Sequence, residues 1–229
     1  MRFDAPLREA VFRERLNRFL ALASIDGEPH FVHVANSGRL RELLVPGVPI
    51  WLAPRVGIQR KTRYDLALVA LDGGLASADA RLPSPLIAEA IQAGRLEAFA
   101  GYTEVGREFT FGESRIDLLL RGEGAPCLLE TKSVTLVEDG LALFPDSPTL
   151  RGAKHLRSLM AAKAVDYRAA VVFVIQRADA RCFAPNDGAD SFFGGMLREA
   201  AGAGVEVHAY GCTIALDEIR LAGPLPIHL

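Results

Sequence analysis

The sequence predicts a mixed α/β protein with two domains, a small β-barrel over residues 1–83 and a mixed-sheet α/β domain over residues 84–229. The chain has 229 residues, which is enough for two modest cores because domains most often contain about 100–150 residues. Its first third consists of short apolar runs separated by turn residues. The remainder alternates apolar strands with amphipathic helices, as an α/β domain requires.

The apolar runs of the first domain predict about five strands. The expected strands cover residues 18–25, 30–36, 49–54, 64–71 and 75–80. Asp26-Gly27 and Pro46-Gly47 mark turns, and the segment SGRLRELL is expected to form a short helical turn. This number and spacing of strands fits a small closed barrel of the OB type.

The pattern changes near Leu82, so we place the domain boundary after Pro83. Ser84 is expected to cap a helix. The elements that follow are a helix over 86–96, strands over 107–111, 115–120 and 127–136, a helix over 151–164, a strand over 169–176, a helix over 192–203 and a strand over 205–210. The near-continuous apolar run AAVVFVI indicates a buried mixed sheet with helices against its faces.

Composition narrows the class of protein. Hydrophobic residues make up 50% of the chain and charged residues 24%, which is typical of globular proteins. No apolar run reaches the roughly 18–20 residues that cross a bilayer, and the N-terminus is too charged for a signal peptide, so we expect a cytoplasmic protein without membrane association. The three cysteines form no CxxC pair, which predicts neither a disulfide framework nor a structural zinc.

Charge is distributed unevenly along the chain. Residues 1–83 hold 12 Lys/Arg against 9 Asp/Glu, whereas residues 84–229 hold 14 against 19. A basic part joined to an acidic part suits a protein that holds a polyanion with the first and gathers carboxylates around a cation with the second.

Three polar side chains interrupt two otherwise apolar strands of the second domain. Glu130 and Lys132 lie two residues apart in CLLETKSV, so they project from one face of the strand. Asp117 lies in the preceding strand, and the glycine-rich link RGEGAP predicts a hairpin that brings it beside Glu130. Burying carboxylates is costly unless they are paired or bound to a metal. Spacing alone leaves two interpretations open, a metal site or a buried ion pair of Lys132 with one of the acids.

An Asp followed by Glu-x-Lys on neighbouring strands after a helix resembles the core of the PD-(D/E)xK nuclease superfamily. The whole chain also resembles the sugar fermentation stimulation protein A family. The segments that carry this second resemblance are RFLALASIDGEPHFVHVANSGRLRELLVPG, RKTRYDLALV, SRIDLLL, ETKSVTLVEDGLALFPD, RGAKHLRSL and VVFVIQR. The resemblance implies an OB-like domain, a nuclease-like domain, DNA binding without marked sequence preference and a regulatory link to maltose metabolism.

The resemblance assigns roles to the three polar residues. We expect Asp117 and Glu130 to bind Mg²⁺ or Mn²⁺, with the backbone carbonyl of Thr131 as a third ligand, because such ions prefer oxygen donors. Lys132 would orient or polarise the attacking water. Glu89 and Gln176 are auxiliary candidates, although a helical Glu is usually solvated and a polar residue at a strand end is usually structural.

Basic residues of the first domain are the candidates for contact with nucleic acid phosphates. These are Arg39, Arg41, Arg60, Lys61 and Arg63. The aromatic residues Trp51 and Phe31 could stack on bases, but side chains of this kind more often belong to a core. His155 opens a helix near the site and is interpreted as a surface or capping residue.

Two functions follow from the sequence. The first is Mg²⁺-dependent hydrolysis of a phosphodiester, with DNA as the expected substrate and RNA equally compatible with the residues. The second is a non-catalytic, sequence-nonspecific DNA-binding regulator linked to sugar metabolism, in which the acids serve structure or hold a metal that takes part only in binding. An enzyme of a small phosphorylated sugar is a third, weaker interpretation that no residue supports.

Overall fold

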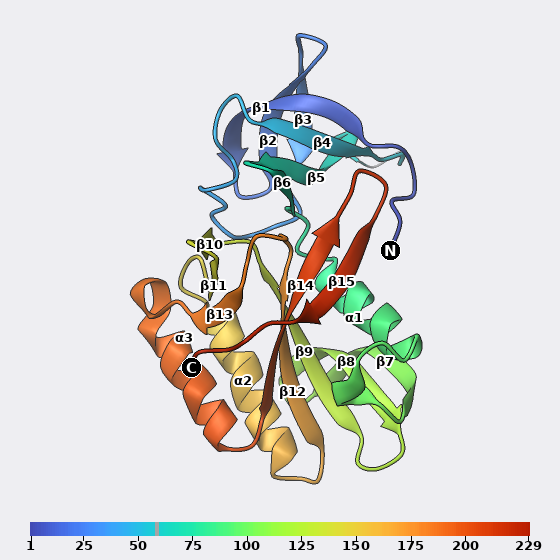
Figure 1. Cartoon of the computed structure of the whole chain (residues 1–229), viewed down its shortest axis with the longest axis vertical. Helices are drawn as coiled ribbons and strands as arrows, with labels where there is room; N and C mark the ends of the chain where they lie inside the picture. Colours follow the sequence, from blue (N-terminus) through green and yellow to red (C-terminus); the bar gives the residue numbers. More distant parts are fainter. Residues whose placement is uncertain (58–59) are drawn as a thin grey trace.

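The computed structural model describes residues 1–57 and 60–229, and it consists of a β-barrel set on a larger α/β domain (Figure 1). The strands of the barrel are β1 (Arg8–Asn17), β2 (Leu20–Ile25), β3 (Glu28–His33), β4 (Pro49–Pro54), β5 (Tyr64–Leu71) and β6 (Gly74–Ser77). They follow the order β3-β2-β1-β4-β5-β6, and a parallel pairing of β3 with β5 closes the barrel. This closure is the OB-like arrangement that the strand pattern predicted.

Strand β1 is the barrel element that the sequence pattern did not predict. Only Ala10 and Phe12 of its ten residues are buried, so the segment reads as charged rather than as a strand. Nevertheless it pairs with both β2 and β4, because those strands offer free edges on its two sides. The segment SGRLRELL forms the expected single helical turn, in which the Leu44 amide donates to the Leu40 carbonyl at 2.9 Å.

The α/β domain is built on a mixed sheet in the order β15-β14-β12-β9-β8-β7. Its elements are α1 (Pro83–Gln92), the 3-10 helix η1 (Glu97–Phe99), β7 (Tyr102–Phe111), β8 (Ser114–Gly122), β9 (Cys127–Val134), β10 (Val137–Glu138), β11 (Leu141–Phe144), α2 (Leu150–Lys163), β12 (Arg168–Ile175), β13 (Cys182–Pro185), α3 (Asp187–Gly202), β14 (Glu206–Ile214) and β15 (Ile219–Pro224). Strands β9, β12 and β14 run parallel, and β7, β8 and β15 run antiparallel to their neighbours.

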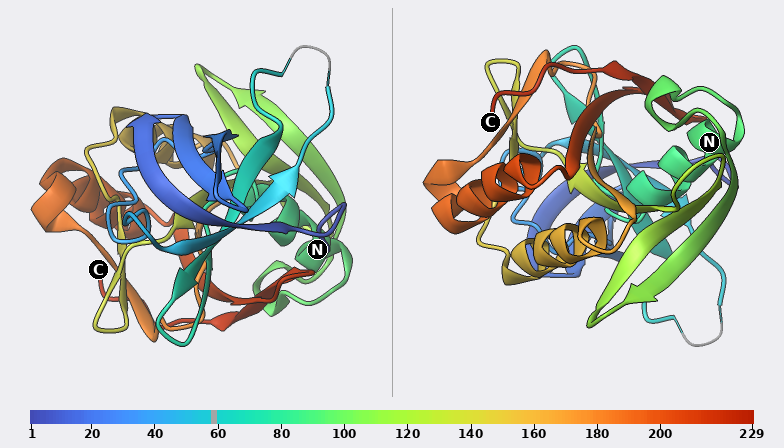
Figure 2. Two further views of the ribbon diagram at one scale, coloured as in Figure 1. Left: turned by 90° about the horizontal axis from the view of Figure 1, so that it is seen from above. Right: turned by 90° about the horizontal axis from the view of Figure 1, so that it is seen from below.

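Helices cover both faces of this sheet (Figure 2). One core lies under α2 and α3 and includes Leu156, Phe173 and Phe193. The other lies under α1 and includes Ile87 and Leu129. The central strand β12 is buried along almost its whole length, which explains its continuous apolar sequence.

The sequence-based expectation was wrong at the start of α1 and at several short strands. The helix begins at Pro83 rather than after Ser84, and its N-cap is Leu82 without a side-chain hydrogen bond, because the two prolines start the helix by themselves. The short sheet β10-β11-β13 and the edge strand β15 were not expected, since runs of two to six residues carry little periodic signal.

The barrel and the sheet domain share several contacts. The first residues of the chain lie against the α/β domain, where the Met1 amino group donates to the carbonyl of Ile219 on β15 at 2.8 Å. Trp51 is half-buried and packs against the small apolar cluster of Ala53, Ala67 and Leu68, as expected, whereas Phe31 is 56% exposed, so its expected core position was wrong. No helix among the described residues is long and apolar enough to cross a membrane.

Candidate metal and nucleic-acid site

The predicted site lies where β8 and β9 separate. The two strands pair as an antiparallel hairpin that ends with Leu118 opposite Leu129, as the glycine-rich link predicted. Asp117 and Glu130 are the next residues on each strand, so their side chains lie at the mouth of the fork. The strand geometry therefore brings together two acids that are 13 positions apart in the sequence.

Glu130 is the centre of the polar cluster in this fork. Its side chain is 3% exposed, and its Oε1 accepts a hydrogen bond from Lys132 Nζ at 2.5 Å. The Nδ1 atom of His155, on helix α2, contacts the same oxygen. The other carboxylate oxygen, Oε2, is buried and has no hydrogen-bond partner among the described residues. A buried carboxylate oxygen without a partner is costly, so it marks a position where a ligand would be bound favourably.

Asp117 is held by Thr131 on the neighbouring strand. Its Oδ2 accepts from the Thr131 amide at 2.8 Å and from the Thr131 hydroxyl at 2.6 Å. Burial raises the pKa of Asp117, and the nearby Glu130 carboxylate raises it further. Burial alone would also raise the pKa of Glu130, but Lys132 and His155 outweigh that effect and lower it. The fork therefore favours positive charge beside its two acids.

The donor set fits a hard divalent cation. Asp117 and Glu130 offer carboxylate oxygens, and an ion beside the buried Glu130 Oε2 would give that atom its missing partner. The described residues contain no cluster of three His, Cys, Asp or Glu side chains suited to a metal. A cation here would accordingly need a backbone oxygen or water to complete its coordination, which is usual for Mg²⁺.

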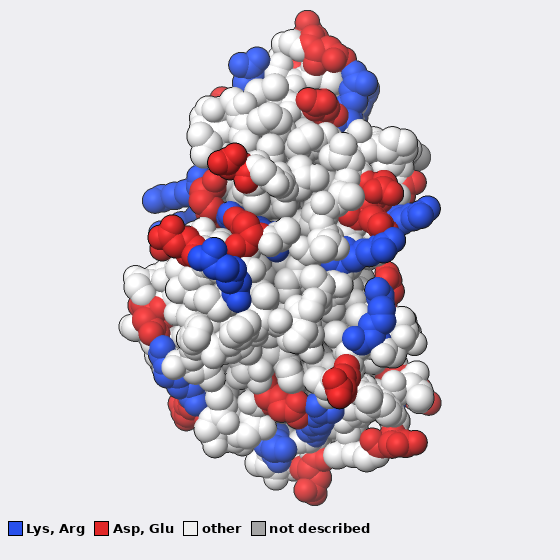
Figure 3. Space-filling model, in the orientation of Figure 1, with Lys and Arg blue, Asp and Glu red and all other residues white. Residues whose placement is uncertain are grey.

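The fork opens into a cleft between the two domains with a volume of about 850 Å³. Five cationic side chains line it: Arg18, Arg81, Arg107, Lys132 and Arg151. Arg81 is already paired with Asp65 and Asp79, whereas Arg18, Arg107 and Arg151 form no ion pair within residues 1–57 and 60–229. On the face shown in Figure 3, charged side chains of both signs gather where the barrel meets the larger domain.

A hydrogen-bonded bridge between the domains forms one wall of this cleft. The Asp146 carboxylate accepts from the backbone amides of Arg39 at 2.5 Å and Leu40 at 3.3 Å. A Cβ atom at Gly38 would lie 2.6 Å from Asp146 Oδ2, so the close approach requires glycine at this position. Arg15 holds the same loop by donating to the carbonyls of Asn36, Gly38 and Arg39.

The five predicted phosphate contacts of the barrel do not line the cleft. Arg39 and Arg41 are exposed, and they directly follow the loop residues Ser37 and Gly38, which do line the cleft. Arg60 is paired with the buried Asp65, and Lys61 and Arg63 are exposed. The role of these residues in binding therefore stays a prediction.

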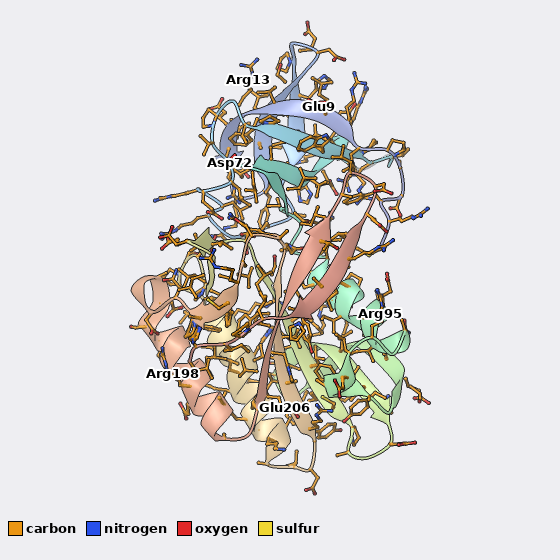
Figure 4. All side chains as sticks on the ribbon, viewed as in Figure 1. Glu9, Arg13, Asp72, Arg95, Arg198 and Glu206 are labelled. Atoms are coloured by element: carbon orange, nitrogen blue, oxygen red, sulfur yellow. The ribbon has the colours of Figure 1, made fainter. Side chains whose placement is uncertain are left out.

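The structure does not bring the two auxiliary candidates into the cleft. Glu89 forms ion pairs with the chain's amino group at 3.6 Å and with Arg95 at 2.8 Å, and Arg95 projects from the outer edge of the molecule in Figure 4. Gln176 is fully buried at the domain junction, where its amide donates to the carbonyl of Asp79 at 3.1 Å and to the hydroxyl of Ser133 at 2.9 Å. Gln176 thus joins the barrel to the sheet.

His155 is a residue of the fork that sequence reasoning missed. Its side chain is buried and contacts both Glu130 and Lys132, so its interpretation as a surface or capping residue was wrong. The spacing of RGAKHLRSL contained the signal, since Ala153, His155 and Leu156 share the buried face of α2 with Leu159. Arg18, Arg107 and Arg151 were also missed, because exposed arginines in separate elements share no sequence pattern.

An OB-like barrel joined to a sheet with an Asp and a Glu-x-Lys at its fork defines a class of two-domain proteins with a nuclease-like fold. The family model "Sugar fermentation stimulation protein RE domain" matches residues 81–218, and "SfsA N-terminal OB domain" matches residues 14–78. The chain therefore belongs to the sugar fermentation stimulation protein family.

Curated relatives match along nearly the whole chain. A sugar fermentation stimulation protein homolog of Moorella thermoacetica is 50% identical over 228 residues, which cover 98% of both chains. The homolog of Desulforamulus reducens is 44% identical and covers 97% of this chain and 93% of its own. A solved structure of Pyrococcus furiosus SfsA, described as a complex with Ca²⁺, is 33% identical with a TM-score of 0.94, covering 100% of this chain and 98% of that one.

Proposed function

We propose that the protein binds nucleic acid in the interdomain cleft and hydrolyses a phosphodiester bond there with the help of Mg²⁺ or Mn²⁺. The observation that carries this proposal is the buried, unpartnered Oε2 of Glu130 beside Asp117 and Lys132 within the described residues. The Ca²⁺ complex of Pyrococcus furiosus SfsA supports it, because Ca²⁺ takes the same oxygen donors as Mg²⁺.

Each residue of the fork has a distinct task in this proposal. Asp117 and Glu130 would hold the cation, which polarises the phosphoryl group when bound, and the Thr131 carbonyl would supply a further oxygen. Lys132 Nζ would orient the attacking water and stabilise negative charge on the phosphate. His155 touches no substrate in this scheme, and it positions Glu130 by holding Oε1.

The exposed arginines of the cleft would bind the phosphates on both sides of the scissile bond. Arg18 comes from the barrel, whereas Arg107 and Arg151 come from β7 and α2, so both domains would contact the nucleic acid. Phosphate contacts position a nucleic acid without reading its sequence. Binding should accordingly show little sequence preference.

The experiment is a nicking assay on supercoiled plasmid and on a labelled single strand with Mg²⁺ or Mn²⁺. Wild-type protein should cleave, chelator should abolish cleavage, and Glu130→Gln and Asp117→Asn should each lower the rate by at least about a hundredfold while nucleic acid binding persists. The matched control is Glu89→Gln, a carboxylate outside the cleft, which should cleave normally. Equal cleavage by Glu130→Gln would attribute the activity to a contaminant.

A second candidate function is binding without cleavage, in a regulator of sugar metabolism. The observation that favours it is the contact of Glu130 Oε1 with both Lys132 and His155. These two side chains compensate the negative charge of the carboxylate without any metal. This candidate predicts nucleic acid affinity in chelator and no cleavage with any divalent ion. It also predicts that Glu130→Gln destabilises the fold but leaves affinity unchanged.

A further inference from the structure

A second hollow, of about 650 Å³, lies beside the cleft. Its walls are the outer face of α2, the tip of the β7–β8 hairpin and the start of α3. The residues that matter for its chemistry are Phe111, Glu113, Leu150, Lys154, Arg157 and Phe192. We call this hollow the α2 groove.

The cleft and the α2 groove share two elements, α2 and the β7–β8 hairpin. On α2, Arg151 and His155 line the cleft, whereas Lys154 and Arg157 line the groove. Along the β7–β8 hairpin, Arg107 lines the cleft and the residues at the tip line the groove. A polymer held in the cleft would therefore reach the groove along α2 and the β7–β8 hairpin.

The groove presents apolar and cationic groups side by side. Phe192 is 49% exposed and Leu150 is 81% exposed, and the Arg157 guanidinium carbon lies 5.6 Å from the centre of the Phe192 ring. Asp190 links the start of α3 to the start of α2, because its carboxylate accepts hydrogen bonds from the Thr149 amide at 2.8 Å and from the Phe193 amide at 2.9 Å. The groove's other cation, Lys154, is paired with Glu113 at 3.3 Å. An exposed aromatic ring beside a guanidinium is what a protein offers to an unstacked base and its phosphate.

The cleft itself offers no comparable platform within the described residues. Phe144 is the aromatic residue among those that line it. Its ring already packs against the rings of Phe173 and Phe193, whose centres lie 5.5 Å and 5.1 Å from its own. The cleft can thus hold phosphates, while stacking of bases has to occur outside it.

Resting on the proposed nucleic acid binding, we infer that the substrate is single-stranded, and that the α2 groove holds the bases next to the phosphates bound in the cleft. In a duplex the bases are stacked on each other and cannot reach the Phe192 ring. The two hollows have volumes of about 850 and 650 Å³, which is the size range of sites for small ligands. An unpaired segment of a few nucleotides fits these dimensions.

The test compares the affinity of the full chain, in chelator so that nothing is cleaved, for a labelled oligothymidylate and for a duplex of equal length. Phe192→Ala should weaken single-strand binding about fivefold or more, the loss expected for one stacked base, and Phe192→Trp should restore it. Arg157→Ala should act in the same direction. The matched control is Leu216→Ala, an apolar side chain that is 50% exposed and lines neither the cleft nor the groove, and it should leave affinity unchanged.

Three outcomes would overturn the inference. These are single-strand affinity unchanged in Phe192→Ala, equal losses for single strand and duplex, and a Leu216→Ala effect as large as that of Phe192→Ala. If Phe192→Ala binds normally while Arg151→Ala does not, the groove assignment fails and the cleft survives. Because binding is measured without metal, failure of the nicking assay leaves this test intact.

Discussion

Arg107 and Arg151 allow the cleft to be tested through the salt dependence of binding. Each phosphate contact on a single strand contributes about 0.7 to the slope of log affinity against log salt. Three cleft arginines without an ion pair among the described residues, at positions 18, 107 and 151, therefore predict a slope of at least about −2. Removing one arginine should reduce the slope by about 0.7 and weaken binding about fivefold at 0.1 M salt.

The assay is fluorescence anisotropy of a labelled oligonucleotide in chelator across a series of KCl concentrations. Arg151→Ala and Arg107→Ala should each show the reduced slope, and the double variant should show both reductions. Arg95→Ala is the matched control, because this arginine is paired with Glu89 outside the cleft. The reasoning is refuted if Arg151→Ala keeps the wild-type slope, or if Arg95→Ala changes it equally.

Three further predictions concern stability and reactivity. Gln176→Ala should lower the free energy of unfolding by about 1–3 kcal/mol, measured by urea denaturation, because it removes the buried amide that joins the domains; an unchanged midpoint would contradict this role. Although burial raises the pKa of Asp65, neighbouring arginines lower it below its ordinary value, so its stabilising effect is present above that value and is lost as pH falls through the folded pKa. In Asp65→Asn the free energy of unfolding should accordingly fall less steeply as the pH is lowered into the acid range. The same steepness as in the wild type would refute the stabilising role of Asp65. Burial raises the pKa of Cys127 and of Cys212 to about 12, so a thiol reagent at pH 8 should modify at most Cys182 in the folded protein; modification of all three would contradict it.

The acid pair was predictable because short-range rules place it. Alternation along β9 puts Glu130 and Lys132 on one face, and the glycine-rich link after β8 leaves an antiparallel hairpin as the simplest connection. These two rules together fix Asp117 opposite Glu130. The match to a known family then assigned a chemistry that the spacing alone left open.

The rest of the site depends on packing that no local pattern encodes. His155 reaches Glu130 because α2 lies across the fork, and Arg18 reaches the cleft because the barrel is docked above it. Asp146 bridges to the loop at Arg39 across more than a hundred residues of chain. Such contacts follow from how the two domains sit on each other, which residue order does not specify.

The proposed function requires Asp117 and Glu130 to hold a divalent cation together at the fork. The anomalous signal of Mn²⁺, recorded from crystals of the wild-type protein and of Glu130→Gln, would locate such an ion. We expect one strong peak within coordination distance of both carboxylates in the wild type and no peak in the variant. A wild-type fork without a peak, in which Lys132 still holds Glu130 at saturating Mn²⁺, would contradict the proposed metal site.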